Sequence, residues 1–211
     1  MKKIKDHYFL RAKREGFAAR SAYKLEEIDR RHRLLRPGMR VLDLGCAPGS
    51  WLQYAAARVG ESGTVVGVDL QAVSKALPPQ ARALTGDVFA MHPGELLAGI
   101  LPAEDFPAGT APFDAVLSDM APKTTGIKQA DAARCAELVR LALALAVGSA
   151  GAPHGLLKPG GALLAKVFQG GEMEALRREF GAAFDRVRTE KPKASRGESV
   201  EVFLLGLGRR G

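Results

Sequence analysis

The sequence predicts an α/β domain in which a mostly parallel sheet carries helices on both faces. Short apolar segments typical of strands alternate with helical segments along most of the chain. Residues 40–51 also have the strand–turn–helix form that opens such a domain. The 211 residues suit one domain with its own hydrophobic core. We therefore expect residues 37–211 to form the α/β fold, and residues 1–36 to form a basic arm and helix attached to it.

The N-terminal region carries the whole excess of positive charge. Residues 1–40 hold 13 Lys or Arg and five Asp or Glu, whereas residues 41–211 hold 18 of each. A second, local excess lies at 186–196. This segregation favours a polyanionic partner, namely nucleic acid, over a merely solvated tail. Aromatic residues in 1–19 either stack on bases or pin the arm to the domain.

Residues 21–35 predict a helix with Leu25 and Ile28 on its buried side and its arginines outward. The first strand follows at 41–44, and a Gly-Cys-Ala-Pro-Gly turn leads into a helix at 51–59 that Ser50 is expected to cap. The turn glycines let a ligand approach the backbone, beside the unpaired N–H groups of the new helix. Asp43, at the strand end, is placed to anchor a cation or an ammonium group. The turn therefore predicts a cofactor site, although it lacks the glycine spacing of dinucleotide-binding or triphosphate loops.

Two further strands end in acidic residues that suit a nucleoside cofactor. The strand at 64–69 ends in Asp69, which is placed to accept hydrogen bonds from ribose hydroxyls. The strand at 82–87 ends in Asp87, which is expected to reach an adenine amino group. The remaining expected elements are a short helix at 95–100, a strand at 113–119, a helix at 129–147, a loop at 149–161, a strand at 162–168, a helix at 172–184 and a strand at 200–207.

Four charged residues form a candidate catalytic set: Lys24, Asp119, Lys166 and Glu201. Lys166 lies in the middle of an apolar strand, where a lysine needs a purpose or a partner. Asp119 ends the preceding strand, and the carboxyl ends of neighbouring parallel strands form the ligand crevice of such sheets. Taken singly, Lys24 has an ordinary explanation as a surface cation, and Glu201 as a guard on an edge strand.

Together these motifs resemble the FtsJ-type (RrmJ/RlmE-like) RNA 2′-O-methyltransferases. The string Asp43-x-Gly45-x-x-Pro48-Gly49 resembles motif I of S-adenosylmethionine-dependent methyltransferases, and Ala47-Pro48-Gly49-Ser50-Trp51 narrows the match to this family. Most members have glycine where this chain has Ser50. The four charged residues match the family's Lys-Asp-Lys-Glu tetrad, and the resemblance covers about residues 6–207.

The resemblance implies a single Rossmann-like methyltransferase domain with a seven-stranded sheet and an RNA-facing N-terminal region. It implies S-adenosylmethionine as cofactor. The residues expected to hold it are Asp43, Gly45, Gly49, Trp51, Asp69, Asp87 and Asp119. The expected reaction is methyl transfer to a ribose 2′-hydroxyl, with a uridine of large-subunit ribosomal RNA as the favoured substrate and transfer RNA as the alternative. No metal is required, because two lysines already supply positive charge and no carboxylate cluster offers a magnesium site.

The tetrad's residue types suit this chemistry. The ribose oxygen must be held about 3 Å from the methyl carbon and lose its proton as it attacks. An ordinary lysine is protonated at neutral pH. Burial of Lys166 and the nearby charge of Lys24 favour the neutral amine, whereas Asp119 and Glu201 act in the opposite direction and orient the amines. The sequence leaves open whether Lys166 accepts the proton or only polarises the hydroxyl.

Two other functions are disfavoured. An RNA-binding assembly factor that had lost catalysis would be expected to lose a tetrad residue or the cofactor glycines. A base-amine methyltransferase usually has Asn/Asp-Pro-Pro-Tyr/Phe where this chain has Ser-Asp-Met-Ala-Pro.

The cysteines, Cys46 and Cys135, lack zinc-site spacing and indicate a reducing compartment. The four histidines are expected on the surface. With no long apolar run and no signal-like start, we expect a cytoplasmic protein with no membrane contact and no evident protein partner.

Overall fold

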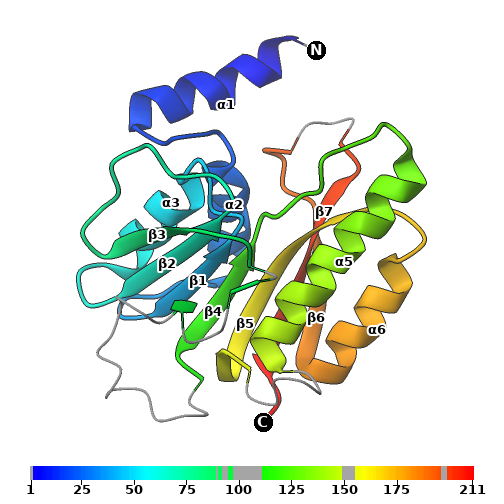
Figure 1. Ribbon diagram of the computed structural model, residues 1–211. Helices are drawn as coiled ribbons and strands as arrows, with labels where there is room; N and C mark the ends of the chain where they lie inside the picture. The colour runs from blue at the N-terminus through cyan, green and yellow to red at the C-terminus, as the bar shows by residue number, and fades with distance from the viewer. Residues whose placement is uncertain (1, 89, 92–94, 97–110, 149–154, 196–198) are drawn as a thin grey trace.

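The computed structural model describes residues 2–88, 90–91, 95–96, 111–148, 155–195 and 199–211 (Figure 1). Its centre is a seven-stranded sheet in the order β3-β2-β1-β4-β5-β7-β6. The strands are β1 (Arg40–Leu44), β2 (Thr64–Asp69), β3 (Ala81–Thr85), β4 (Phe113–Ser118), β5 (Leu157–Phe168), β6 (Phe184–Glu190) and β7 (Glu201–Arg209). Strand β7 runs antiparallel to both of its neighbours, and the other neighbouring pairs are parallel. The predicted fold class is confirmed.

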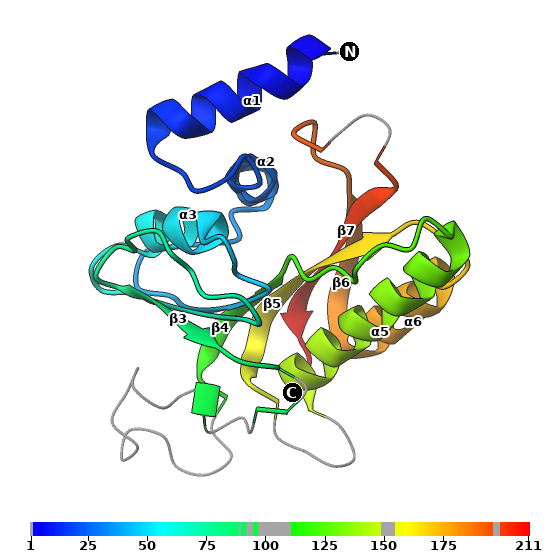
Figure 2. The same cartoon turned by 45° about the horizontal axis from the view of Figure 1, so that its top comes forward.

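Helices cover both faces of the sheet (Figures 1 and 2). Those that cover the faces are α2 (Ala22–His32), α3 (Ser50–Val59), α5 (Lys128–Val147) and α6 (Met173–Ala183), and α1 (Lys2–Glu15) precedes them in the chain. Because successive strand residues point to opposite faces, Val41 packs in a core with residues of α2 and α3, whereas Leu42 packs in a second core with residues of α5 and α6. The sheet is therefore buried on both sides, which explains its nearly continuous apolar strands.

Helix α1 lies outside the sheet layers, beyond α2 (Figures 1 and 2). The ring of Tyr8 lies 5.5 Å from the ring of Tyr23 on α2, and the ring of Phe17 lies 5.8 Å from it. The Arg11 guanidinium lies over the same ring, 4.2 Å from its centroid. Phe9, in contrast, is 60% exposed. Of the two predicted uses of these aromatic residues, Tyr8 and Phe17 therefore serve to pin the arm.

Two elements differ from the expected ones. Residues 184–190 form the edge strand β6, which we did not predict because its exposed Asp185, Arg186 and Arg188 obscure any apolar pattern; such charges are common on edge strands. Strand β5 begins at Leu157, within a stretch expected to be a loop because of its Pro159, Gly160 and Gly161. Leu157 pairs with Phe113, and the register then shifts before Ala115, so an irregular strand absorbs these residues.

Three smaller expectations have different outcomes. His32 is not a surface residue: its Nε2 lies 2.9 Å from Glu190 Oε1, and its side chain is only 15% exposed. The short helix expected at 95–100 falls mostly outside the described residues, as do two of the four histidines. No described helix is long and apolar enough to cross a membrane, and the cytoplasmic location stays a prediction.

Candidate active site

The site is centred where the strand order reverses, between β1 and β4. After β1 the chain builds β2 and β3 on one side, and it then returns to build β4 and the remaining strands on the other. Such a switch point leaves a crevice at the carboxyl ends of the strands. The Asp119 N–H donates to the Leu44 carbonyl at 3.1 Å, which joins the ends of β4 and β1. A cavity of about 400 Å³ opens here, within the usual range for small-molecule sites.

Four of the predicted cofactor residues line this cavity: Gly45, Asp69, Asp87 and Asp119. Gly45 has a φ of +78°, and a Cβ at this position would lie 2.9 Å from the Met120 Cα, so the turn requires glycine. Asp69 also shapes the turn, because its carboxylate accepts hydrogen bonds from the N–H groups of Ala47 (2.9 Å) and Gln71 (2.8 Å). The same carboxylate thus faces the cavity and holds its wall.

Asp43, Gly49 and Trp51 are not among the residues that line the cavity. The Trp51 indole is buried, and its Nε1–H donates to the Ser21 carbonyl at 2.9 Å. Gly49 precedes α3 with a φ of +106°, and a Cβ there would lie 2.8 Å from a Val73 methyl group. Their direct contact with a cofactor stays a prediction, whereas their effect on the shape of the turn is visible.

The capping prediction for Ser50 is wrong. Ser50 is the first residue of α3, and Gly49 occupies the N-cap position without a side-chain hydrogen bond. The Ser50 hydroxyl lies instead 2.7 Å from the Ser21 hydroxyl, immediately before α2. Together with the Trp51–Ser21 hydrogen bond, this contact ties the start of α2 to the cofactor turn. Sequence alone could not reveal this pairing, because the two serines are 29 positions apart.

Asp43 is a fully buried carboxylate, and neither of its oxygens has a hydrogen-bond partner among the described residues. Burial raises the pKa of Asp43 well above its ordinary value, and the negative charges of Asp119 and Asp69 raise it further. A buried acid without a partner is costly to the fold. Its position among the acids of the cavity therefore suits a site whose ligand brings positive charge.

The strand register brings the catalytic set together. Ser118 of β4 pairs with Ala165 of β5, so the next residues, Asp119 and Lys166, meet. The Lys166 ammonium donates to the Asp119 carbonyl and, at 3.1 Å, to its Oδ1. Glu201 of β7 pairs with Phe168, two positions beyond Lys166 on β5, and therefore lies diagonally from Lys166 on the same face of the sheet.

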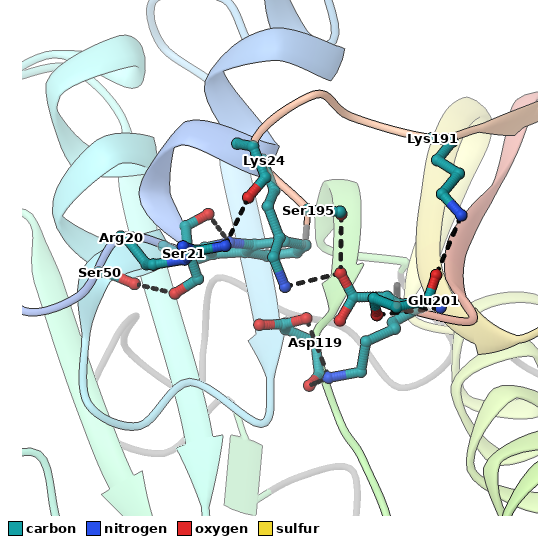
Figure 3. Close-up of polar contacts among 12 residues, drawn as sticks. Arg20, Ser21, Lys24, Ser50, Asp119, Lys191, Ser195 and Glu201 are labelled. Carbon is teal, nitrogen blue, oxygen red and sulfur yellow. Dashed lines mark hydrogen bonds and ion pairs between the residues drawn. The ribbon is translucent and has the colours of Figure 1, made fainter. Parts of the chain in front are cut away.

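Lys24 reaches this face from α2. Its Nζ lies 2.7 Å from Glu201 Oε1, and Figure 3 shows the two side chains pointing toward one another. All four groups are largely enclosed: the exposed fraction of the side chain is 7% for Lys166 and at most 19% for the others. The tetrad thus consists of two ion pairs, Lys166–Asp119 and Lys24–Glu201. The sequence predicts that Asp119 and Lys166 can meet, because they lie on neighbouring strands, but it does not predict that Lys24 and Glu201 are partners.

The tetrad lies between two hollows. Asp119 lines the large cavity, whereas Lys24 and Glu201 line a second hollow of about 270 Å³ whose other lining residues include Arg20, Ser21 and Ser199. The two hollows share no lining residue. A molecule in either hollow would lie beside residues of the tetrad, so the arrangement suits a group transfer between two substrates.

Other reactive groups contribute little to the site. Cys46 and Cys135 are both free and buried, and burial raises the pKa of each thiol, so neither is an accessible nucleophile. Within the described parts of the chain, no group of three or more His, Cys, Asp or Glu side chains is arranged to hold a metal ion. The candidate chemistry therefore depends on the two lysines and their carboxylates.

The chain is similar to known methyltransferases. Residues 17–209 match the family described as FtsJ-like methyltransferase. Over 211 residues the chain is 47% identical to a ribosomal RNA large subunit methyltransferase E of Oleidesulfovibrio alaskensis, covering 100% of this chain and 95% of the relative. It is 46% identical to a protein of the same name from Syntrophobacter fumaroxidans, covering 98% and 97%.

A solved structure is also similar. It is a Plasmodium falciparum protein assigned as a ribosomal RNA methyltransferase, and it superposes with a TM-score of 0.74 at 26% identity. The match covers 92% of this chain and 100% of that one. With the family match spanning most of the fold and the tetrad, the chain belongs to the FtsJ-like methyltransferase family.

Proposed function

We propose that the protein transfers a methyl group from S-adenosylmethionine to a ribose 2′-hydroxyl of RNA, namely a uridine of large-subunit ribosomal RNA. The observation that carries this proposal is the enclosed Lys166–Asp119 pair beside the large cavity, which Asp119 lines. The names of the relatives, which are ribosomal RNA large subunit methyltransferases, support the choice of RNA. The net charge of +8 is consistent with a polyanionic substrate.

The large cavity fits the proposed cofactor. Asp69 ends β2 and Asp87 follows β3, where acidic residues suit the ribose and adenine of a nucleoside. The unpartnered carboxylate of Asp43 lies behind this wall and suits a ligand with a cationic amino acid part. When bound, S-adenosylmethionine supplies a methyl group activated by a positively charged sulfur. The protein itself needs to bind this group, exclude water and orient the acceptor.

Each tetrad residue then has a distinct task. Lys166 holds the acceptor hydroxyl and removes or polarises its proton, which makes the oxygen a better nucleophile. Asp119 fixes the Lys166 amine through its carbonyl and carboxylate oxygens. Lys24 and Glu201 form the wall of the second hollow and position the ribose that enters from it. In-line transfer needs this alignment more than it needs strong acid–base chemistry.

The function test is methylation of defined RNA substrates. We expect the purified protein to incorporate label from S-adenosylmethionine into large ribosomal subunits, and nuclease mapping should locate the label on the 2′-oxygen of a uridine. Labelled transfer RNA instead would change the substrate but keep the reaction. Label on a base would exclude 2′-O-transfer, and no incorporation into any RNA would favour a non-catalytic binding protein.

The N-terminal region is the proposed RNA surface, but its free charge is smaller than its composition implies. Several of its cations are paired within the protein: Arg11 with Glu15 and Glu26, Lys24 with Glu201, and Arg31 with Glu27 and Glu190. Arg30 contacts Glu26 at 3.6 Å but its side chain is 76% exposed, and Arg36 is also exposed. Arg30 and Arg36 are therefore better candidates for phosphate contacts than the cations with closer acidic partners.

Replacing Arg30 and Arg36 with glutamine should weaken RNA binding in a salt-dependent way. If both contact phosphates, the slope of log affinity against log salt should fall by about one to two, because fewer counterions are released. Affinity for S-adenosylmethionine should not change. The matched control is the Arg177→Gln, Arg178→Gln variant, which removes two exposed arginines of α6 from the opposite face of the sheet. Equal slopes for both variants and the parent would place the RNA surface elsewhere, with 186–196 the next candidate.

A further inference from the structure

We propose that Ser195 is a positioning residue for methyl transfer, which holds Glu201 so that Glu201 in turn holds Lys24. The inference rests on the proposed function. Ser195 lies in the segment between β6 and β7 and is 8% exposed. It is not among the lining residues of either hollow. Any effect on the reaction must therefore pass through another side chain.

The contact that carries the inference is a shared oxygen. The Ser195 hydroxyl donates to Glu201 Oε1 at 3.0 Å, and the Lys24 ammonium lies 2.7 Å from the same oxygen (Figure 3). A Lys–Glu pair alone must hold two flexible side chains in one geometry, which costs conformational entropy. A second, short and buried donor restricts the carboxylate. The hydroxyl of Ser195 therefore selects the Glu201 conformation in which Lys24 is seated.

Ser195 is itself held from α2, the helix that carries Lys24. The Arg20 guanidinium donates to the Ala194 carbonyl at 2.9 Å, and the Ser195 N–H donates to the Pro192 carbonyl at 3.0 Å. These contacts close a ring that runs from Arg20, two residues before α2, through Ala194 and Ser195 to Glu201 and back to Lys24 in the first turn of α2. Further along α2, Glu27 accepts a hydrogen bond from the Lys193 N–H at 2.7 Å. Residues 193 and 194 are thus bound to α2 and to the residue pair that precedes it.

A closed ring of this kind predicts a specific kinetic effect. Without the hydroxyl, Glu201 keeps one donor instead of two, and Lys24 loses its fixed partner without losing its charge. The second hollow keeps its lining, so RNA and cofactor should still bind. Ser195→Ala should therefore lower the single-turnover rate about tenfold, the effect of one hydrogen bond, while the KM values for RNA and S-adenosylmethionine stay within about twofold.

The test is a double-mutant cycle with Glu201→Ala, measured as single-turnover methylation of RNA by the full chain. The Ser195→Ala change should cost about tenfold in the parent but almost nothing in the Glu201→Ala background, because its only route to Lys24 is then gone. The matched control is Ser62→Ala, which removes an exposed hydroxyl before β2 and should leave the rate unchanged. Thermal unfolding of each variant reports on the fold independently.

Each result decides the inference. Equal tenfold losses in both backgrounds would mean that Ser195 acts through general stability, and the inference would be wrong. A parent enzyme that methylates RNA while Ser195→Ala retains full activity would overturn the inference but leave the proposed function intact. A parent that methylates no RNA would remove the proposed function, and the inference with it.

Discussion

Replacing Lys166 with alanine should lower the single-turnover rate of methyl transfer by about 10²–10⁴-fold, the range expected for loss of a group that moves or polarises a proton. Lys166 is 7% exposed and reaches both the carbonyl and the carboxylate of Asp119. Since its task arises as the oxygen attacks, affinities for RNA and cofactor should change little. The measurement is a rate at saturating RNA and S-adenosylmethionine.

A matched control lies on the same strand. Lys158, near the start of β5, forms an ion pair with Asp114 at 2.7 Å, far from the switch point along the strand. Lys158→Ala should therefore keep the rate within about twofold and cost only the small stabilisation of a partly exposed pair. Lys166→Arg should be almost as damaging as alanine, because a guanidinium is bulkier, planar and cannot give up its proton near neutral pH.

The pH dependence separates the two roles open to Lys166. If its amine accepts the proton, the single-turnover rate should rise with pH, because a general base acts in its deprotonated form. If it only polarises the hydroxyl as an ammonium, the rate should not rise in that way. A Lys166→Ala variant with a near-normal rate would remove the residue from the mechanism altogether.

Replacing Asp43 with asparagine should separate cofactor affinity from stability. The side chain keeps its size but loses its charge. We expect affinity for S-adenosylmethionine to fall about 10–100-fold, which corresponds to losing a hydrogen bond to a charged group of about 1.5–3 kcal/mol. Without cofactor, the free energy of unfolding should instead increase, because an unpartnered buried carboxylate is replaced by a neutral amide. Calorimetric titration measures the first effect and denaturant unfolding the second.

The gain in stability should depend on pH with a definite sign. The pKa of Asp43 is raised in the folded protein by burial and by Asp119 and Asp69. Between its ordinary pKa, near 3.8, and this raised value, the folded protein binds more protons than the unfolded chain, so the contribution of Asp43 to stability falls as pH rises. The free energy of unfolding of Asp43→Asn should therefore increase relative to the parent as pH rises from about 4.

The matched control for this change is Asp114→Asn. Asp114 lies near the start of β4, whereas Asp119 follows the other end of this strand. The Asp114 carboxylate accepts hydrogen bonds from the Lys158 ammonium and the Arg40 N–H. The control should leave cofactor affinity unchanged and should not gain stability. If Asp43→Asn binds S-adenosylmethionine as tightly as the parent does, Asp43 is not a cofactor anchor. Stability curves that stay parallel across pH would mean that its charge is compensated in the fold.

Local features of the sequence determined the fold class and the composition of the site. The alternation of strand-like and helix-like segments predicted a parallel sheet with helices on both faces. This prediction was possible because the apolar period that distinguishes a strand from a helix is visible in neighbouring residues. The glycine-rich turn after β1 likewise predicted the position of the cavity wall. Gly45 must be glycine, because its positive φ and the nearby Met120 backbone leave no room for a Cβ. Lys166 and Asp119 could be named because a lysine in an apolar strand and an acid at a strand end are unusual. Lys24 and Glu201 were assigned through the resemblance to the family's tetrad.

The sequence placed Asp119 and Lys166 on neighbouring strands, but only the tertiary structure showed that Lys24 and Glu201 are partners. The register of β4, β5 and β7 joins Lys166 to Asp119 and leaves Glu201 for Lys24. The missed strand β6, the misassigned start of β5 and the Ser50–Ser21 contact share one physical cause. In each, a long-range neighbour satisfies backbone or side-chain groups whose local sequence suggests a loop or a cap. The same holds for Ser195. Nothing in its local sequence indicates a role, and only the fold places its hydroxyl beside Glu201.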